Sequence, residues 1–138
     1  MTTPDDSPTI FSRIIAGELP GRFVYRDEDV VSFLTIAPIR PGHLLVVPRE
    51  PIDKWTDLPE QTWASLMATS QRIGRALEPL FECERVAVIL AGLEVPHCHV
   101  HLIPIRTEAD LSFANADSSV SAEALDAIAE KIRTALQG

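Results

Sequence analysis

The sequence predicts an α+β domain with a mostly antiparallel sheet of about five strands, a short N-terminal helix, one long helix and an extra C-terminal helix. Short segments rich in β-branched and aromatic residues predict the strands, and stretches with apolar residues at helical spacing predict the helices. The links between consecutive strands are too short for parallel crossovers, which favours antiparallel pairing. A chain of 138 residues is long enough for one domain with a proper core.

The first part of the chain predicts a short helix followed by three strands. After a loose tail over residues 1–8, Ser7 and Pro8 have the residue types that start a helix, and Gly17 can end it. Turn-forming acidic residues separate the first two strands, which therefore form a hairpin. The three strands are expected at residues 22–25, 30–35 and 43–47.

The second part predicts the long helix, two strands and the last helix. Asp57 and Glu60 have the spacing of a capping box, so we expect the long helix to follow Asp57 and to end near Leu77. A buried strand is expected at residues 86–90 and a further strand at 97–104. Ser121 is expected to cap a final amphipathic helix that continues to Leu136.

Composition narrows the classes of function. The net charge is −8, which argues against a nucleic-acid polymer as partner because such binding needs a basic surface. No apolar run approaches the length of a membrane span, and the polar, acidic N-terminus does not resemble a signal peptide, so we expect no membrane and a cytoplasmic location. The two cysteines, Cys83 and Cys98, form no CxxC motif, which predicts neither a disulfide framework nor a thiolate zinc site.

The most informative stretch holds three of the four histidines, His97, His99 and His101, at every second position of a strand-like segment. Side chains alternate along a strand, so the three imidazoles are predicted to share one face at a spacing of ~6.5–7 Å. The residues between them are predicted to face the core: Cys98, Val100 and Leu102.

Three interpretations of this cluster are open. The histidines could be exposed residues of a solvated strand, although such strands more often carry mixed charges. Two of them, together with His43, could bind a metal ion. In the third interpretation, which we favour, a neutral imidazole attacks phosphorus while its neighbours orient it, bind phosphate oxygens and assist the leaving group.

The stretch from His97 to Ile103, HCHVHLI, matches the His-x-His-x-His-x-x signature with apolar x. The run from Ile10 to Glu50 has the order and spacing of the N-terminal half of the same family. On these residues the chain resembles the histidine triad (HIT) family, in its nucleotide-binding or phosphoramidase-type branch. The resemblance implies a HIT-like domain, which we expect over residues 9–106. Beyond the residues that carry the resemblance, we expect an extension over 107–138 whose helix packs on the same domain.

The resemblance implies a mechanism that needs no metal and no other cofactor. Members of the family are nucleotide hydrolases and transferases that act at the α-phosphate through a covalent nucleotidyl-histidine. By motif position, His99 is the nucleophile, His101 contacts the phosphate and assists the leaving group, and His97 orients the cluster. His43 matches a further histidine beside the site.

The resemblance also implies a nucleoside pocket made by the first helix and the second strand. Its matching positions here are Phe11, Ile14, Phe33, Thr35 and Ile36, together with Ile10. Thr35 stands where many members have an aspartate that binds the ribose. Glu94 stands in the phosphate-binding loop, where a serine or threonine is common, and the usual asparagine before the triad is absent.

The zinc site that some members carry is not expected here. The positions of its two cysteines hold Thr9 and Ser12, and Pro51 stands in place of a histidine ligand.

From these observations we expect a nucleotide hydrolase or phosphoramidase. The expected partners are a small nucleotide, purine and of adenosine type, and a second copy of the chain in a homodimer. A catalytically weak nucleotide-binding or interaction protein is the alternative, and a metal-dependent hydrolase is the third hypothesis.

Overall fold

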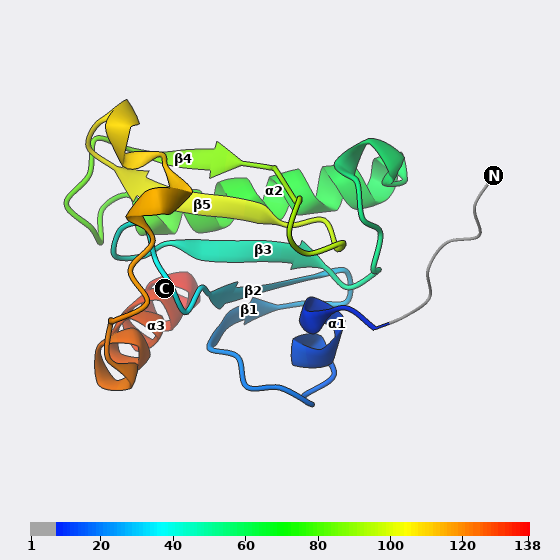
Figure 1. Ribbon diagram of the computed structural model, residues 1–138, viewed down its shortest axis with the longest axis horizontal. Helices are drawn as coiled ribbons and strands as arrows, with labels where there is room; N and C mark the ends of the chain where they lie inside the picture. Colours follow the sequence, from blue (N-terminus) through cyan, green and yellow to red (C-terminus); the bar gives the residue numbers. More distant parts are fainter. Residues whose placement is uncertain (1–7) are drawn as a thin grey trace.

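The computed structural model describes residues 8–138 and contains one sheet with helices on both of its faces (Figure 1). In chain order the elements are α1 (Ile10–Ile15), β1 (Phe23–Arg26), β2 (Val30–Leu34), β3 (Leu44–Pro48), α2 (Glu60–Leu77), β4 (Arg85–Ile89), β5 (Val100–Ile105) and α3 (Ala122–Gln137). Three short 3-10 helices are present as well: η1 (Trp55–Asp57), η2 (Glu108–Asp110) and η3 (Phe113–Asn115).

The sheet has five strands in the order β1-β2-β3-β5-β4, and every neighbouring pair is antiparallel. β5 lies between β3 and β4, so the strand that carries His101 runs through the interior of the sheet. In its register with β3, His101 lies opposite Leu45. The α+β fold with an antiparallel five-stranded sheet is therefore confirmed.

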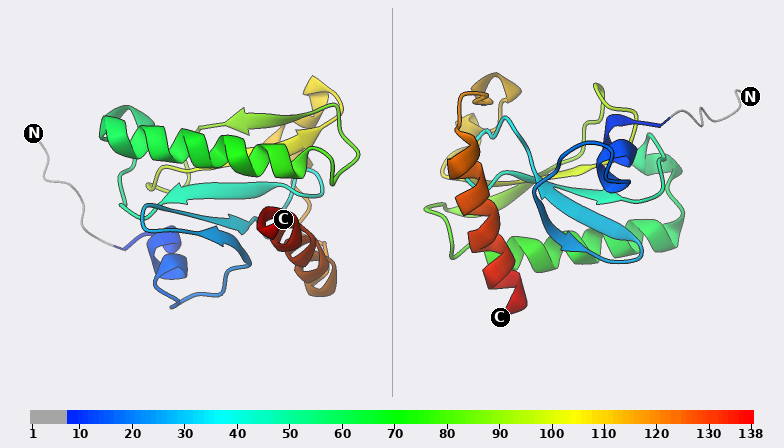
Figure 2. Two further views of the ribbon diagram at one scale, coloured as in Figure 1. Left: turned by 180° about the vertical axis from the view of Figure 1, so that it is seen from behind. Right: turned by 90° about the horizontal axis from the view of Figure 1, so that it is seen from below.

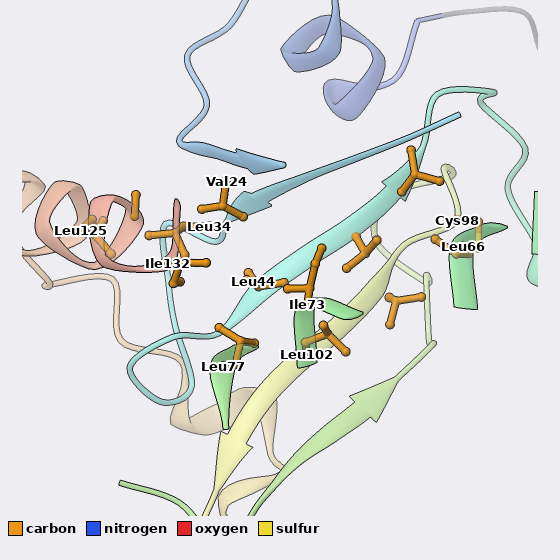
Figure 3. Close-up of a cluster of buried hydrophobic side chains, with 14 residues drawn as sticks. Val24, Leu34, Leu44, Leu66, Ile73, Leu77, Cys98, Leu102, Leu125 and Ile132 are labelled. Carbon is orange, nitrogen blue, oxygen red and sulfur yellow. The ribbon is translucent and has the colours of Figure 1, made fainter. Parts of the chain in front are cut away.

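One face of the sheet is covered by α2 and α3, and this face holds the main hydrophobic core (Figure 3). The prediction that Cys98, Val100 and Leu102 face the core is confirmed, because all three are buried there against residues such as Leu66 and Ile73 of α2. α3 adds Leu125, Ala129 and Ile132 to the same cluster.

The opposite face carries α1 and the 3-10 segments that precede α3 (Figure 2). Phe11 of α1 packs there on Val31 and Phe33 of β2 and on Leu45 and Val47 of β3. Successive residues of β3 and β5 thus alternate between the two faces, as strand geometry requires.

Two of the expected helix starts are wrong. α1 begins after Thr9, which forms a capping box with Ser12, whereas Ser7 lies outside the described residues. α2 begins after Pro59, and no side chain caps it, because Asp57 belongs to the short helix η1 instead. The proline fixes an extended backbone immediately before the helix, which leaves Asp57 too early in the chain to cap it.

Two expectations about the last strands also need correction. β4, expected to be buried, is an edge strand, and Val88 is 54% exposed. The strand expected from residue 97 starts only at Val100, because His97 lies in a bend and the backbone before Val100 is not paired as a ladder. Within residues 8–138, the helices are too short or too polar to cross a lipid bilayer.

Candidate active site

The four histidines come together on the face of the sheet opposite α2. His101 lies in β5, His99 and His97 lie in the segment leading into it, and His43 directly precedes β3. The ring centroids of His99 and His101 are 4.8 Å apart, and those of His43 and His101 are 5.2 Å apart. The arrangement is therefore one cluster of imidazoles and not three separate surface residues.

Both ring nitrogens of His97 are occupied. Nε2 lies 2.7 Å from the carbonyl oxygen of Pro48, which can only accept, so Nε2 carries the proton. Nδ1 lies 2.7 Å from the hydroxyl of Thr9 and in the neutral ring accepts its proton. With no free nitrogen and no exposed surface, the His97 side chain has no atom to offer to a substrate.

His99 is oriented by the backbone. Its Nδ1–H donates to the carbonyl oxygen of His97 over 2.8 Å, which fixes the proton on Nδ1. The neutral ring therefore carries an unshared electron pair on Nε2. Phe11 lies edge-on to the ring, with centroids 4.8 Å apart, and limits its rotation.

His43 and His101 form a second chain of hydrogen bonds. The backbone N–H of Ile39 donates to Nδ1 of His43 over 3.0 Å, so this nitrogen is unprotonated. Nε2–H of His43 then donates to Nδ1 of His101 over 2.9 Å. In the neutral pair, the remaining proton of His101 lies on Nε2, where it forms a hydrogen-bond donor beside the electron pair of His99.

Burial keeps the whole cluster uncharged. Desolvation, together with the charge of a neighbouring histidine, lowers the pKa of His43 to about 3 and that of His101 to about 4; the neighbour is His101 for His43 and His99 for His101. Desolvation also lowers the pKa of His97 and of His99 below 6.5. The hydrogen-bond directions above are those of neutral rings, so geometry and electrostatics agree.

Gly42 gives His43 its position at the start of β3. Its φ of +92° lies in the region that side chains disfavour, and a Cβ there would lie 2.7 Å from Phe81. The Pro-Gly-His segment is therefore a turn that only glycine fits, and it directs the next residue toward His101.

The structure brings some, but not all, of the expected substrate-binding residues to the histidines. Phe11 lies against His97, His99 and Phe33. Ile14 packs against the apolar cluster that contains Phe11 and Phe33. Farther along, the hydroxyl of Thr35 accepts from the N–H of Ala37 over 3.2 Å. Ile36 is 74% exposed, and Glu94 is exposed as well.

A cavity of about 500 Å³ adjoins His99. It lies between the segment before α2 and the loop that follows β4, and its lining includes Lys54, Trp55, Leu93 and Cys98. Phe113 of η3 lies edge-on to His101 on the other side, with centroids 5.1 Å apart. The sequence did not assign Lys54 or Trp55 to the site, because only the folded sheet brings these distant segments together.

Side chains that could bind a metal ion together are not found in the described part of the chain. Among residues 8–138, no group of three or more His, Cys, Asp or Glu side chains is arranged to hold an ion. The hydroxyls of Thr9 and Ser12 are engaged in the α1 capping box.

Comparison with known proteins gives the family. The family model of the HIT domain matches residues 16–108, a segment that includes all four histidines. The chain belongs to the HIT domain family. An uncharacterised HIT-like protein of Methanocaldococcus jannaschii is 36% identical over 73% of this chain and 81% of the relative.

Two further relatives of this HIT protein carry enzyme names. Adenylylsulfatase HINT1 of Arabidopsis thaliana is 36% identical over 73% of this chain and 74% of its own length. An asymmetrical bis(5'-nucleosyl)-tetraphosphatase of Schizosaccharomyces pombe is 32% identical, but the match covers only 50% of that enzyme and 64% of this chain. The family therefore includes hydrolases of nucleotides.

Solved structures agree with the HIT fold over nearly the whole chain. A Hit-like protein of Bartonella henselae has a TM-score of 0.83 at 29% identity, covering 97% of this chain and 99% of that one. A zinc-bound histidine triad protein of Mycobacterium smegmatis has a TM-score of 0.77, also at 29% identity, over 93% and 92% of the two chains. The structural similarity to these proteins therefore extends beyond the segment that the family model matches.

Proposed function

We propose that this protein is a nucleotide hydrolase or phosphoramidase that acts at the α-phosphate and forms a covalent nucleotidyl-histidine on His99. The observation that carries the proposal is the pair of reactive nitrogens on neighbouring rings. Nδ1–H of His99 is held by a carbonyl, so the electron pair of Nε2 is free, and the Nε2–H of His101 lies beside it.

In the first step, Nε2 of His99 attacks the α-phosphorus and forms a P–N bond while the bond to the leaving group breaks. The leaving group departs with the bonding electrons and takes its proton from solvent. Nε2–H of His101 donates a hydrogen bond to the developing negative charge. In the second step, water attacks the phosphorus, the P–N bond breaks, and the electron pair returns to His99 while the proton of water passes to solvent.

His97 and His43 support these two rings without touching the reacting atoms. His97 supplies the carbonyl that fixes His99, and His43 supplies the donor that fixes His101. Phe11, Ile14 and Phe33 are proposed to hold the base of an adenosine-type purine nucleotide, since Phe11 is in edge contact with His99 and packs in one apolar cluster with Ile14 and Phe33. Thr35, Ile36 and Glu94 also stay proposed substrate contacts.

The test combines turnover with detection of the intermediate. Wild-type protein and the His99→Ala variant are mixed with a fluorogenic adenosine phosphoramidate, and turnover is expected to fall by about 10⁴–10⁶ because the nucleophile is lost. Brief incubation and an acid quench should leave a nucleotidyl adduct, visible in the intact mass, on wild type only. Equal turnover by the two proteins would contradict the proposal, and loss of wild-type turnover on chelation would favour a metal-dependent hydrolase.

The alternative function is nucleotide binding with weak catalysis. It is favoured by Thr35, whose oxygen already accepts a backbone hydrogen bond and which cannot bridge a ribose diol as a carboxylate does. Calorimetry with adenosine monophosphate separates the two functions, because tight binding without turnover of any phosphoramidate supports the alternative.

A homodimer is proposed through β4 and α2. β4 is an edge strand with Val88 exposed, and a groove of about 590 Å³ lies between it and α2. The hydroxyl of Ser70 is buried beside this groove and has no hydrogen-bond partner within the described residues. Light scattering with size-exclusion chromatography measures the mass in solution, and a monomer at all concentrations would contradict the proposal. A cytoplasmic location stays a prediction.

A further inference from the structure

Thr9 links α1 to the histidine cluster through its hydroxyl group. The residue is the N-cap of α1 and only 8% exposed, and its Oγ1 lies 2.7 Å from Nδ1 of His97. The two residues are 88 positions apart in the sequence. No other side chain is recorded as a hydrogen-bond partner of the His97 ring within residues 8–138.

Each hydrogen-bonding role of the Thr9 hydroxyl has a partner. Oγ1 accepts from the backbone N–H of Ser12 over 2.9 Å, and its own proton is directed to Nδ1 of His97. The other side of the ring donates to Pro48 at the end of β3. The His97 ring is thus held between α1 and β3, and the carbonyl of the same residue accepts from Nδ1–H of His99.

We propose that Thr9 is a positioning residue of the active site: its hydroxyl holds the ring of His97, and thereby the carbonyl that directs Nε2 of His99 toward phosphorus. The inference rests on the proposed function, since it assigns Thr9 a part in that reaction. Thr9 itself does not touch the substrate. It acts through two successive residues, His97 and His99.

Loss of the hydroxyl has a defined physical consequence. In a Thr9→Val variant the side-chain shape is kept, but Nδ1 of a fully buried ring loses the one donor that residues 8–138 provide. An unsatisfied buried polar atom is costly, so the ring and the backbone at His97 shift to find another partner. A displacement of about 1 Å at a reacting atom can lower a rate by roughly 10²-fold.

The experiment compares three variants at matched conditions. Thr9→Val is expected to lower kcat about 10- to 100-fold with a smaller change in KM, whereas Thr9→Ser keeps the hydroxyl and retains kcat within about 3-fold. Ser12→Ala is the matched control. It breaks the other half of the capping box, in which Oγ of Ser12 accepts from the N–H of Thr9 over 2.7 Å, but leaves the contact with His97. We expect it to retain kcat within about 3-fold.

A spectroscopic measurement keeps the inference testable if Thr9→Val does not fold or if no substrate is turned over. The ¹⁵N shifts of the imidazoles in wild type should show His97 protonated at Nε2 and His99 protonated at Nδ1 at neutral pH. In folded Thr9→Val, the shift of Nδ1 of His97 should change, and Thr9→Ser should restore it.

Three outcomes would overturn the inference: His97 protonated at Nδ1 in wild type, unchanged ring shifts in Thr9→Val, or a loss of kcat in Ser12→Ala equal to that in Thr9→Val. Failure of the proposed function gives a different result. Wild type would then turn over no phosphoramidate, while the ring shifts of His97 would still respond to Thr9→Val.

Discussion

The two faces of the sheet are built from the same strands but are stabilised in different ways. The face under α2 and α3 is filled by aliphatic side chains, among them Leu44 of β3 and Leu102 of β5 (Figure 3). On the opposite face the same part of the chain presents His99 and His101, each held by a specific hydrogen bond. The packing of side-chain volume stabilises the first face, whereas on the second the buried ring nitrogens of His97 and His43 need partners of the right kind.

Because of this difference, the site tolerates fewer kinds of side chain than the hydrophobic core does. An aliphatic side chain can be exchanged for another of similar volume at modest cost. A histidine of the cluster has two nitrogens with different roles, and reversing the proton on one ring disturbs the next. The chain from Ile39 through His43 to His101 has only one arrangement of protons when its rings are neutral.

His101 and Leu102 are adjacent in β5 and lie on opposite faces of the sheet, so substituting each in turn tests whether the two faces act separately. His101→Ala is expected to lower kcat by about 10²–10⁴ because a hydrogen-bond donor to the phosphate is lost, while the protein stays folded. Leu102→Ala is expected to leave kcat within about 3-fold in folded protein but to lower the free energy of unfolding by about 2–5 kcal/mol. Turnover and urea unfolding measure the two effects. Equal loss of kcat in both folded variants would show that the faces do not act separately.

A fall in pH should destabilise the folded protein through the buried histidines His43 and His101. The unfolded chain binds protons below about pH 6.5, but in the folded state the pKa is about 4 for His101 and about 3 for His43. The free energy of unfolding should therefore decrease as the pH falls from 6.5 to 4, by roughly 1 kcal/mol per pH unit for each of these two histidines. Urea unfolding at pH 7, 6 and 5 tests this; a flat profile would contradict it, and His43→Gln should reduce the slope.

Substitution of His43 is expected to change kcat least, because His43 acts on the substrate only through its hydrogen bond to His101. His43→Ala removes the donor to Nδ1 of His101 and should lower kcat about 10-fold, with KM little changed. His43→Gln offers an amide N–H in a similar place and should recover part of that loss. Turnover is measured for both variants, and an unchanged kcat in His43→Ala would contradict the role of His43 in orienting His101.

Much of the fold was predictable from the sequence, because the spacing of apolar residues and the positions of turn-forming residues determine where helices and strands form. The five strands, the long helix and the antiparallel pairing were expected, and they are present. The starts of α1 and α2 were placed wrongly because several polar residues precede each helix, and only the backbone geometry selects Thr9 and Pro59. The exposure of β4 depends on its place in the strand order, which no local pattern contains.

The site was predictable only in part, for the same physical reason. Alternation along a strand indicated that His99 and His101 share a face, and the structure places their rings in contact distance. The partners of the rings were not predictable, because Thr9, Pro48 and the N–H of Ile39 come from other segments. Assigning the proton on each ring required those partners.

The two-sided use of β5 has a consequence for how this protein can change over evolutionary time. Inserting or deleting one residue within β5, between Val100 and Leu102, would move side chains to the opposite face, where an imidazole would be buried against α2 or a leucine exposed in the site. The segment can therefore diverge only by substitution, with its length fixed. The loop that follows β4 is exposed over Leu93 and Glu94, and it is free to lengthen or shorten as substrates diversify.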